Sequence, residues 1–140
     1  MPQQLWRRDP DSSNLPAPRT FVRVFVAAEQ LEPTTAWYER LLGVERDMVM
    51  PYPEEDLALT AVGGFLIIAG TDESLAPFRR TVGTLLVPDI GPYEERFRED
   101  GLEFIQQRFR APVGEGFTVR HPDGAVIEYV HHRPAAHELS

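Results

Sequence analysis

The sequence contains no cysteine, which excludes disulfide bonds, thiolate catalysis and cysteine-ligated zinc. It also has no apolar run long enough to span a membrane, and no apolar stretch of the secretory type near its N-terminus. Basic residues are in the minority, because 14 lysines and arginines stand against 22 aspartates and glutamates. The resulting net charge of −8 argues against a surface that binds nucleic acid or other phosphates. We therefore expect a cytoplasmic protein with neither nucleic-acid nor membrane partners.

One stretch, FTVRHPDGAVIEYV at residues 117–130, stands out among the 140 residues. Apolar residues fill both arms around a Pro-Asp-Gly turn, and an Asp-Gly dipeptide between such arms predicts a β-hairpin. Glu128 is the one carboxylate in the second arm, between Ile127 and Tyr129. A charged side chain in a strand of this kind needs a partner or a function, so the group that Glu128 faces matters.

The two ends of the chain differ from the middle in composition. Residues 1–20 are rich in proline and have no apolar period, which predicts an extended arm. Trp6 and Leu15 are expected to dock, either on the same chain or on a partner subunit. Residues 133–140 are predicted to form a tail, and residues 21–132 a single domain.

Within this domain the same order of elements is predicted twice: a strand, a helix that begins near a proline and stops at a glycine, and then three strands. The first strand and the helix are expected at 21–28 and 33–43, followed by strands at 44–50, 57–62 and 65–69. The second set is expected at 82–87, 92–100, 102–109 and in the hairpin of 117–130. Residues 70–80 read as a polar connection between the halves.

Three pairs of matched positions have nearly the same separation. They are Pro33 and Pro92, 59 apart, Gly43 and Gly101, 58 apart, and Gly64 and Gly124, 60 apart. This regularity predicts a duplicated βαβββ unit, with modules at about 21–70 and 81–132.

Three segments resemble the marks of the vicinal oxygen chelate superfamily: WYERLLG at 37–43, VPDI at 87–90 and HPDGAVIE at 121–128. That superfamily includes glyoxalase I, extradiol dioxygenases, fosfomycin-resistance enzymes and bleomycin-resistance proteins. The resemblance covers about residues 21–132. It implies an α+β fold of two βαβββ modules, whose sheets curl around an open, cup-shaped pocket with the helices packed outside.

The resemblance also implies where a metal site would lie. Metal-using members take four ligands from matched places in the two modules, which here fall on Arg23, Ile68, Val82 and Glu128. Arginine is always protonated and has no lone pair to donate, and isoleucine and valine have no donor atom. We therefore predict that the metal site is lost and that the protein has no cofactor.

The four histidines do not replace the missing ligands. His131 and His132 are adjacent, so they point to opposite faces of a strand. His137 lies in the tail, and His121 precedes the hairpin turn at the rim of the sheet. We expect structural roles for all four.

Arg23 and Glu128 are instead expected to form an ion pair inside the cup. The pair has three possible roles: a structural one, the fixing of polar atoms of a ligand, or a general base at Glu128. The last would need a raised pKa, which Arg23 opposes. Strand alternation and the aromatic content then give the predicted ligand site, with Phe78 and Phe109 as further walls for a flat organic molecule. The predicted site residues are Arg23, Phe25, Tyr52, Phe65, Thr84, Phe117 and Glu128.

Three functional classes follow. The first is a metal-free protein of the bleomycin-resistance type, which sequesters an antibiotic or another natural product and, by the same resemblance, forms a homodimer. The alternative is an isomerase, cyclase or lyase of secondary metabolism, with Glu128 as acid or base or with an unrecognised divalent metal. The third is a domain whose pocket is filled and whose role is oligomeric or regulatory.

Overall fold

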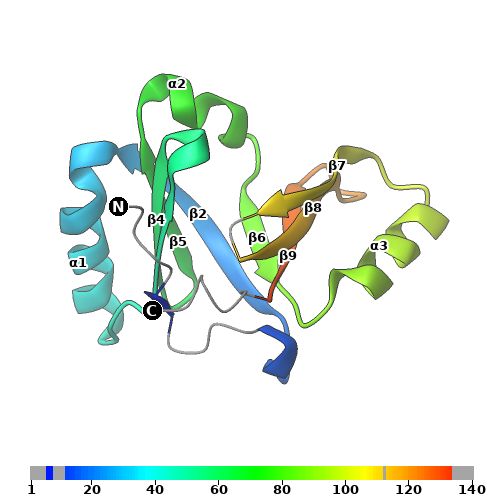
Figure 1. Cartoon of the computed structure of the whole chain (residues 1–140), viewed down its shortest axis with the longest axis horizontal. Coiled ribbons are helices and arrows are strands. Elements are labelled where there is room, and N and C mark those ends of the chain that lie inside the picture. The colour runs from blue at the N-terminus through cyan, green and yellow to red at the C-terminus, as the bar shows by residue number, and fades with distance from the viewer. Residues whose placement is uncertain (1–5, 8–11, 112, 134–140) are drawn as a thin grey trace.

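The computed structural model describes residues 6–7, 12–111 and 113–133. Its strands form one curled, nine-stranded mixed sheet in the order β1-β3-β4-β5-β2-β6-β9-β8-β7. Figure 1 shows the sheet divided into two halves, with α1 and α3 on the two outer sides. The predicted α+β fold of two βαβββ modules is confirmed.

The first module contains β2 (Arg19–Ala27), α1 (Leu31–Leu42), β3 (Met48–Tyr52), β4 (Leu57–Val62) and β5 (Phe65–Gly70). Helix α1 packs on the outer side of β4 and β5. It begins two residues before Pro33, so that the proline lies in the first turn, where its missing N–H costs nothing. It ends at Gly43, which has a left-handed φ of 68° that suits a residue without a Cβ.

The second module contains β6 (Gly83–Leu86), α3 (Ile90–Glu99), β7 (Phe104–Ala111), β8 (Gly114–Arg120) and β9 (Val126–His132). Helix α3 begins two residues before the predicted start at Pro92, because Asp89 caps it by accepting a hydrogen bond from the Gly91 N–H at 2.8 Å. It packs on the outer face of β8 and β9 over a second hydrophobic cluster. The fully or nearly buried members of that cluster are Val87, Ile90, Phe117, Val119 and Tyr129.

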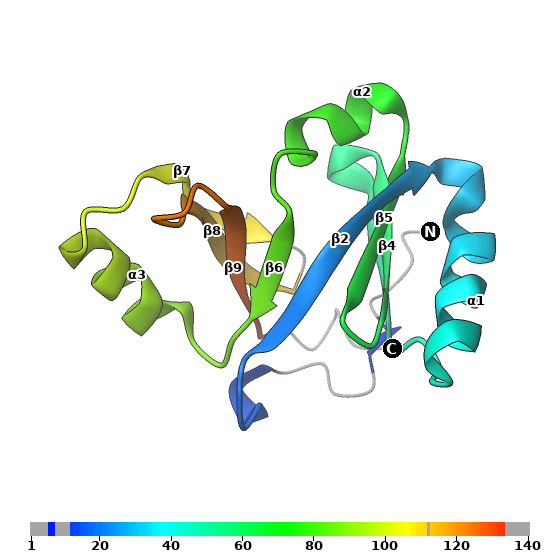
Figure 2. The ribbon, with the colours of Figure 1, turned by 180° about the vertical axis from the view of Figure 1, so that it is seen from behind.

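The two modules meet where their first strands pair. Strands β2 and β6 are antiparallel, with Phe21 opposite Thr84, and they lie side by side at the centre of Figure 2. In each module the first strand also pairs in parallel with the fourth, β2 with β5 and β6 with β9. This shared pairing confirms the duplicated unit that the glycine and proline spacings predict.

The described part of the N-terminal segment lies on its own chain. Strand β1 (Trp6–Arg7) pairs with β3, and the short 3-10 helix η1 (Ser12–Asn14) lies against β9. Ser12 is fully buried, donates a hydrogen bond to the Val87 carbonyl at 2.7 Å and accepts one from the His132 N–H at 2.8 Å. The predicted boundaries at 20 and 133 stay predictions, because residues 1–5, 8–11 and 134–140 lie outside the described residues, as does the side chain of Trp6.

The connection between the modules is more ordered than the sequence indicates. It contains α2 (Asp72–Leu75) and the 3-10 helix η4 (Ala76–Phe78), where we expect only a polar linker. A capping box begins α2: the Ser74 N–H donates to Thr71 Oγ1 at 3.0 Å, and the Thr71 N–H donates to Ser74 Oγ at 2.9 Å. The remaining 3-10 helices are η2 (Ala28–Gln30) and η3 (Pro53–Glu55).

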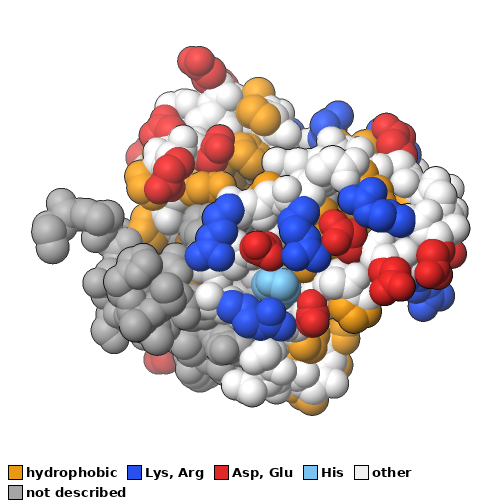
Figure 3. Space-filling view, turned by 45° about the vertical axis from the view of Figure 1, so that its right-hand side comes forward, with side chains coloured by type: hydrophobic (Ala, Val, Ile, Leu, Met, Phe, Trp, Pro, Cys, Tyr) orange, Lys and Arg blue, Asp and Glu red, His pale blue; other side chains and the backbone are white. Residues whose placement is uncertain are grey.

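Charges of both signs alternate on the face shown in Figure 3, rather than forming a patch of one sign. In the second module, Arg108 lies 3.0 Å from Glu94 and 3.2 Å from Glu115, and Arg98 lies 3.6 Å from Glu94. Within the described residues, no helix has the length and apolar character that crossing a membrane requires.

Candidate ligand-binding cavity

A cavity of about 370 Å³ lies on the inner side of the curled sheet, between the two modules. We call its two sides the first wall and the second wall, after the modules that supply them. The strands of the first module contribute to the first wall Phe21, Arg23, Met48, Met50, Tyr52, Leu57, Leu59, Leu66 and Ile68. Those of the second module contribute to the second wall Thr84, Leu86, Ile105, Gln106, Phe109, Thr118, Glu128, Val130 and His132.

Arg23 and Glu128 form the ion pair that the sequence predicts. The Arg23 Nη2 lies 3.0 Å from the Glu128 Oε1, and the Arg23 side chain is only 5% exposed. Thr84 completes a closed cluster, because its Oγ1 accepts from the Arg23 Nε at 2.9 Å and donates to the same Glu128 Oε1 at 3.2 Å. Each member therefore fixes the other two, which makes this part of the cavity rigid.

Glu128 belongs to a row of polar side chains that crosses the second wall. In the strand ladders, Thr84 of β6 and Thr118 of β8 both lie directly opposite Glu128, and Gln106 of β7 lies opposite Thr118. Residues paired in this way place their side chains on one face of the sheet. We call Thr84, Glu128, Thr118 and Gln106 the polar row, and all four line the cavity.

Tyr52 brings a hydroxyl group to the first wall. Burial raises the pKa of this hydroxyl, and the negative charges of Glu55, Glu128 and Glu54 raise it further. The phenol therefore stays neutral at physiological pH and can donate or accept a hydrogen bond.

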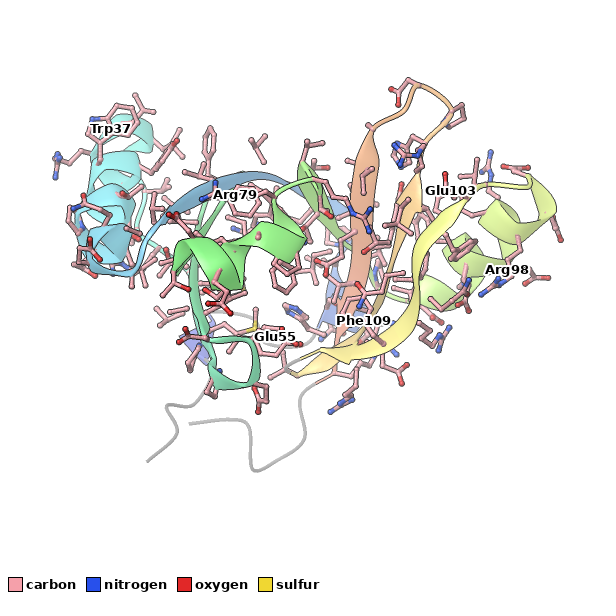
Figure 4. The ribbon with its side chains drawn as sticks, turned by 90° about the horizontal axis from the view of Figure 1, so that it is seen from above. Trp37, Glu55, Arg79, Arg98, Glu103 and Phe109 are labelled. Carbon is pink, nitrogen blue, oxygen red and sulfur yellow. The ribbon has the colours of Figure 1, made fainter. Side chains whose placement is uncertain are left out.

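Figure 4 looks into the molecule from above: Glu55 and Phe109 come from opposite modules toward the centre, whereas Trp37 and Arg98 lie at the two outer ends.

Four of the seven predicted site residues, Arg23, Tyr52, Thr84 and Glu128, line the cavity, and three do not. Phe65 lies on the outer face, where its ring packs at a tilt against that of Tyr38 of α1, with 4.5 Å between ring centroids. Phe117 is fully buried beneath α3. Both placements are wrong by one residue of strand alternation, because their neighbours Leu66 and Thr118 are the ones that line the cavity.

Phe25 lies on the face that alternation predicts, but at its edge. It packs against the hydrophobic cluster of the inner face, and the guanidinium of Arg79 lies over its ring at 5.6 Å. The predicted walls Phe78 and Phe109 both line the cavity. Whether any of these residues contacts a ligand stays a prediction.

The sequence reasoning missed most of the first wall. Met48 and Met50, like Leu57 and Leu59, are two residues apart, but Val49 and Ala58 between them are also apolar, so no apolar/polar alternation marked the inner face. Gln106 gave no signal either, because β7 has register shifts on both sides of it.

The metal site that the resemblance implies does not fit the residues at its four matched positions. Arg23, Ile68 and Glu128 line the cavity, but Val82 is 55% exposed and is not part of the lining. The single carboxylate is already bonded to a guanidinium, which competes with any cation. His132 also lines the cavity, but it is four residues along β9 from Glu128, about 13 Å away at the usual strand rise. Across residues 6–7, 12–111 and 113–133, no three His, Asp or Glu side chains are grouped to hold a metal ion.

His131 lies on the opposite face of β9, as its position next to His132 predicts. Its Nδ1 accepts a hydrogen bond from the Ile90 N–H at 3.0 Å, at the start of α3. Burial lowers the pKa of His131, and the positive charge of Arg133 lowers it further. Packing thus keeps the imidazole neutral, and its role is structural, because it binds the first N–H group of α3.

His121 lies near the hairpin turn, where its Nε2 is hydrogen-bonded to the Tyr129 hydroxyl at 2.8 Å. Tyr129 packs in the cluster beneath α3, on the side of the sheet away from the cavity. His137 lies outside the described residues.

Neither a scan against protein-family models nor a search of curated proteins finds a match to this chain. Solved structures do match. An uncharacterised protein from Methanosarcina mazei is 36% identical, with a TM-score of 0.69 over 81% of this chain and 91% of that one. The methylmalonyl-CoA epimerase of Mycobacterium tuberculosis is 22% identical, with a TM-score of 0.57 over 84% and 87% of the two chains. A Streptomyces coelicolor methylmalonyl-CoA epimerase in complex with 2-nitronate-propionyl-CoA is 16% identical, with a TM-score of 0.54 over 86% and 100%.

Proposed function

We propose that this chain, which has the fold of the methylmalonyl-CoA epimerases and resembles the vicinal oxygen chelate superfamily in sequence, binds a small organic molecule in the cavity without a metal ion, as bleomycin-resistance proteins of that superfamily do. One observation carries the proposal: Arg23 and Glu128, at two of the four positions to which the resemblance assigns metal ligands, are bonded to each other and to Thr84. A guanidinium there satisfies the carboxylate that a metal would otherwise bind. The cavity volume of about 370 Å³ lies within the range of small-molecule sites.

The charges in the lining favour a ligand without net charge. Arg23 and Arg80 supply two positive charges, and Glu55 and Glu128 supply two negative ones, so the formal sum is zero with His132 neutral. The net charge of −8 therefore belongs to the rest of the molecule and not to the cavity. A ligand held mainly by apolar contact and a few hydrogen bonds suits this lining.

Two measurements on the purified protein test the proposal. Elemental analysis is expected to find no stoichiometric Zn, Fe, Ni or Mn. A screen of polycyclic natural products by thermal shift and calorimetry is expected to find a ligand that binds one to one. Met50→Trp, which places a larger side chain in the cavity, should abolish that binding, whereas Leu41→Trp on the exposed face of α1 should leave it unchanged. Stoichiometric metal, or equal binding by both variants, would refute the proposal.

An enzyme built on the same cavity is the second candidate. It is favoured by the Glu128 Oε2, which has no hydrogen-bond partner among the described residues and belongs to a side chain that lines the cavity. Such an oxygen can take a proton from a bound molecule, as an isomerase, cyclase or lyase requires. The methylmalonyl-CoA epimerases with this fold make an epimerisation the first reaction to test. Glu128→Gln separates the candidates, because turnover would disappear in an enzyme, while a binding protein would return its ligand unchanged in either form.

Sequestration of an antibiotic and assembly into a homodimer belong to the same proposal. Expression of the chain in a sensitive host should raise tolerance to the bound compound, and Met50→Trp should remove that tolerance. Light scattering after size-exclusion chromatography measures the assembly, and a mass near 15.9 kDa would exclude the homodimer.

A further inference from the structure

We infer that the ligand is a flat, neutral molecule with one apolar face and one polar edge, and that this edge donates a hydrogen bond to the Oε2 of Glu128. The inference rests on the proposed function and adds the chemical class of the ligand. Three features of the described residues carry it: the occupancy of the two Glu128 oxygens, the extent of the polar row, and the contrast between the two walls.

The two carboxylate oxygens of Glu128 are not equivalent. Oε1 accepts from Thr84 at 3.2 Å and lies 3.0 Å from the Arg23 Nη2, whereas Oε2 has no partner in the part of the chain that the structure describes. An ionised carboxylate oxygen can only accept hydrogen bonds, so the complementary ligand atom is a donor. Because Arg23 already neutralises the charge, a neutral hydroxyl, phenol or N–H group is sufficient.

The polar row continues from Glu128 toward the edge of the sheet. Thr84, Glu128, Thr118 and Gln106 lie on four neighbouring strands, which gives a row about 14 Å long at the usual strand spacing. Gln106 joins the row through the irregular register of β7, where the consecutive residues Ile105 and Gln106 both line the cavity. Bulges of this kind re-aim side chains next to binding sites. A ligand edge with several hydrogen-bonding groups therefore has partners along its length.

Most of the first wall is apolar. Met48, Met50, Leu59, Leu66 and Ile68 are each no more than 8% exposed. Methionine side chains adapt their shape to the surface that they contact, so this wall suits the face of a ring system without selecting one outline. The ligand is thus oriented by the second wall and held by the first.

Glu128→Gln should reverse the hydrogen-bond preference of the cavity. Arg23 and Thr84 both present donors, so the amide oxygen of the new side chain will stay on them, and the NH2 group will replace Oε2. The position then changes from an acceptor to a donor. Glu55→Gln is the matched control, because Glu55 also lines the cavity but does not belong to the polar row.

The test uses two probes of similar shape, 4-phenylphenol as a donor and 4-phenylpyridine as an acceptor only. Their Kd values are measured by calorimetry on the full chain near pH 8, where the pyridine is neutral. We expect the wild type and Glu55→Gln to bind the phenol about tenfold more tightly, the usual worth of a hydrogen bond to a charged group. Glu128→Gln should bind the pyridine more tightly than the phenol.

The outcomes separate the inference from the proposed function. If the wild type binds neither probe, the inference is wrong. If Met50→Trp binds them as well as the wild type does, the proposed function fails and the inference with it. If both probes bind in the cavity with equal Kd values, the proposed function stands and the inference is wrong. The ratio of the two wild-type Kd values decides this even if Glu128→Gln does not fold.

Discussion

The two walls of the cavity come from one repeated unit, yet their chemistry differs. Apart from Arg23 and Tyr52, the first-module strands line it with Phe21, Met48, Met50, Leu57, Leu59, Leu66 and Ile68, all of them apolar. The second-module strands cross it with the polar row. Ile68 of β5 and Glu128 of β9 illustrate the difference, because they occupy matched positions 60 residues apart.

The two copies of the module share their strand pairing and differ in the side chains that line the cavity. The strand pairing is the same in both, with the first strand antiparallel to its counterpart and parallel to its own fourth strand. The two copies thus share their backbone geometry, whereas only Glu128 among the four matched positions carries a group that could bind a metal ion. A cavity in which one wall is mostly apolar and the other carries a polar row among apolar side chains can orient a ligand, which two similar walls would not do.

The largest loss of stability is expected on substitution of Arg23, which bonds to Glu128 across the two walls. Arg23→Ala would leave Glu128 without its charge partner in a largely buried site, since the Glu128 side chain is 18% exposed. Removing one member of a buried pair costs about 3 kcal/mol of the free energy of unfolding, measurable by urea titration. Arg120→Ala is the control, because its pair with Glu103 has side chains 42% and 65% exposed. A similar small loss in both variants would show that the Arg23 pair is not part of the core.

Truncating an apolar side chain of the first wall should lower the free energy of unfolding by a smaller amount. Leu59→Ala removes most of a side chain that is 8% exposed and packs in the inner hydrophobic cluster. Because the side chain already borders a cavity, we expect about 2 kcal/mol, the low end for such truncations, together with weaker binding of both probes. Urea unfolding and calorimetry give the two numbers. Weaker binding of the phenol alone would contradict a wall that acts through apolar contact.

The modules also differ at the start of their helices, and this difference predicts that the stability of the folded chain depends on pH. No side chain caps α1 at Gln30, whereas His131 accepts from the Ile90 N–H at the start of α3. Burial lowers the pKa of His131 in the folded chain below its ordinary value of 6.5. As the pH falls through about 6.5, the unfolded chain therefore binds a proton first, and the folded state loses stability.

Charged groups of both signs surround His131, and they shift its pKa in opposite directions. Arg133 and Arg108 disfavour the protonated form, and Asp89 and Glu115 favour it. His131→Asn keeps an acceptor near the position of Nδ1 but does not titrate. Its free energy of unfolding should therefore fall less than that of the wild type between about pH 8 and about pH 5. Parallel curves for the two proteins would contradict a neutral His131 in the folded chain.

The smallest effect is expected in the middle of the polar row. Thr118→Val keeps the shape of the side chain and removes only the hydroxyl group. We expect the free energy of unfolding to change by less than about 1 kcal/mol, and the Kd of 4-phenylphenol to stay within about threefold. A large loss of phenol binding would mean that Thr118, and not Glu128, is the main anchor of the ligand.

The sequence predicts the fold well, because the repeat leaves its trace in residues with special backbone roles. Gly43 and Gly101, one of the matched pairs, both have positive φ values. In the hairpin pair Gly124 has one too, whereas in the first module it is Gly63, next to the matched Gly64, that does. The Arg23–Glu128 pair was also predictable, because two opposite charges in a partly apolar cavity are costly to remove from water unless they pair with each other.

The errors in the predicted site residues arise where a shift of one residue along a strand moves a side chain from the cavity to the outer face. Phe65 is as apolar as its neighbour Leu66, and in β8 the apolar Phe117 and Val119 pack under α3 while the polar Thr118 lines the cavity. Apolar character alone therefore does not tell which face of the strand is the cavity. Helix α2 was missed because it has four residues and no apolar period, although Thr71 and Ser74 have the spacing of a capping box. The polar row depends on strand register, and β7 has register shifts that a sequence does not reveal.

The most direct test of a metal-free cavity is the Kd of 4-phenylphenol for the full chain, measured by calorimetry with and without excess EDTA. Because Glu128 is already bonded to Arg23 and Thr84, we expect no metal ion to take part in binding, so the Kd should be the same in both conditions. Loss of binding in EDTA, restored by a divalent cation, would contradict the account.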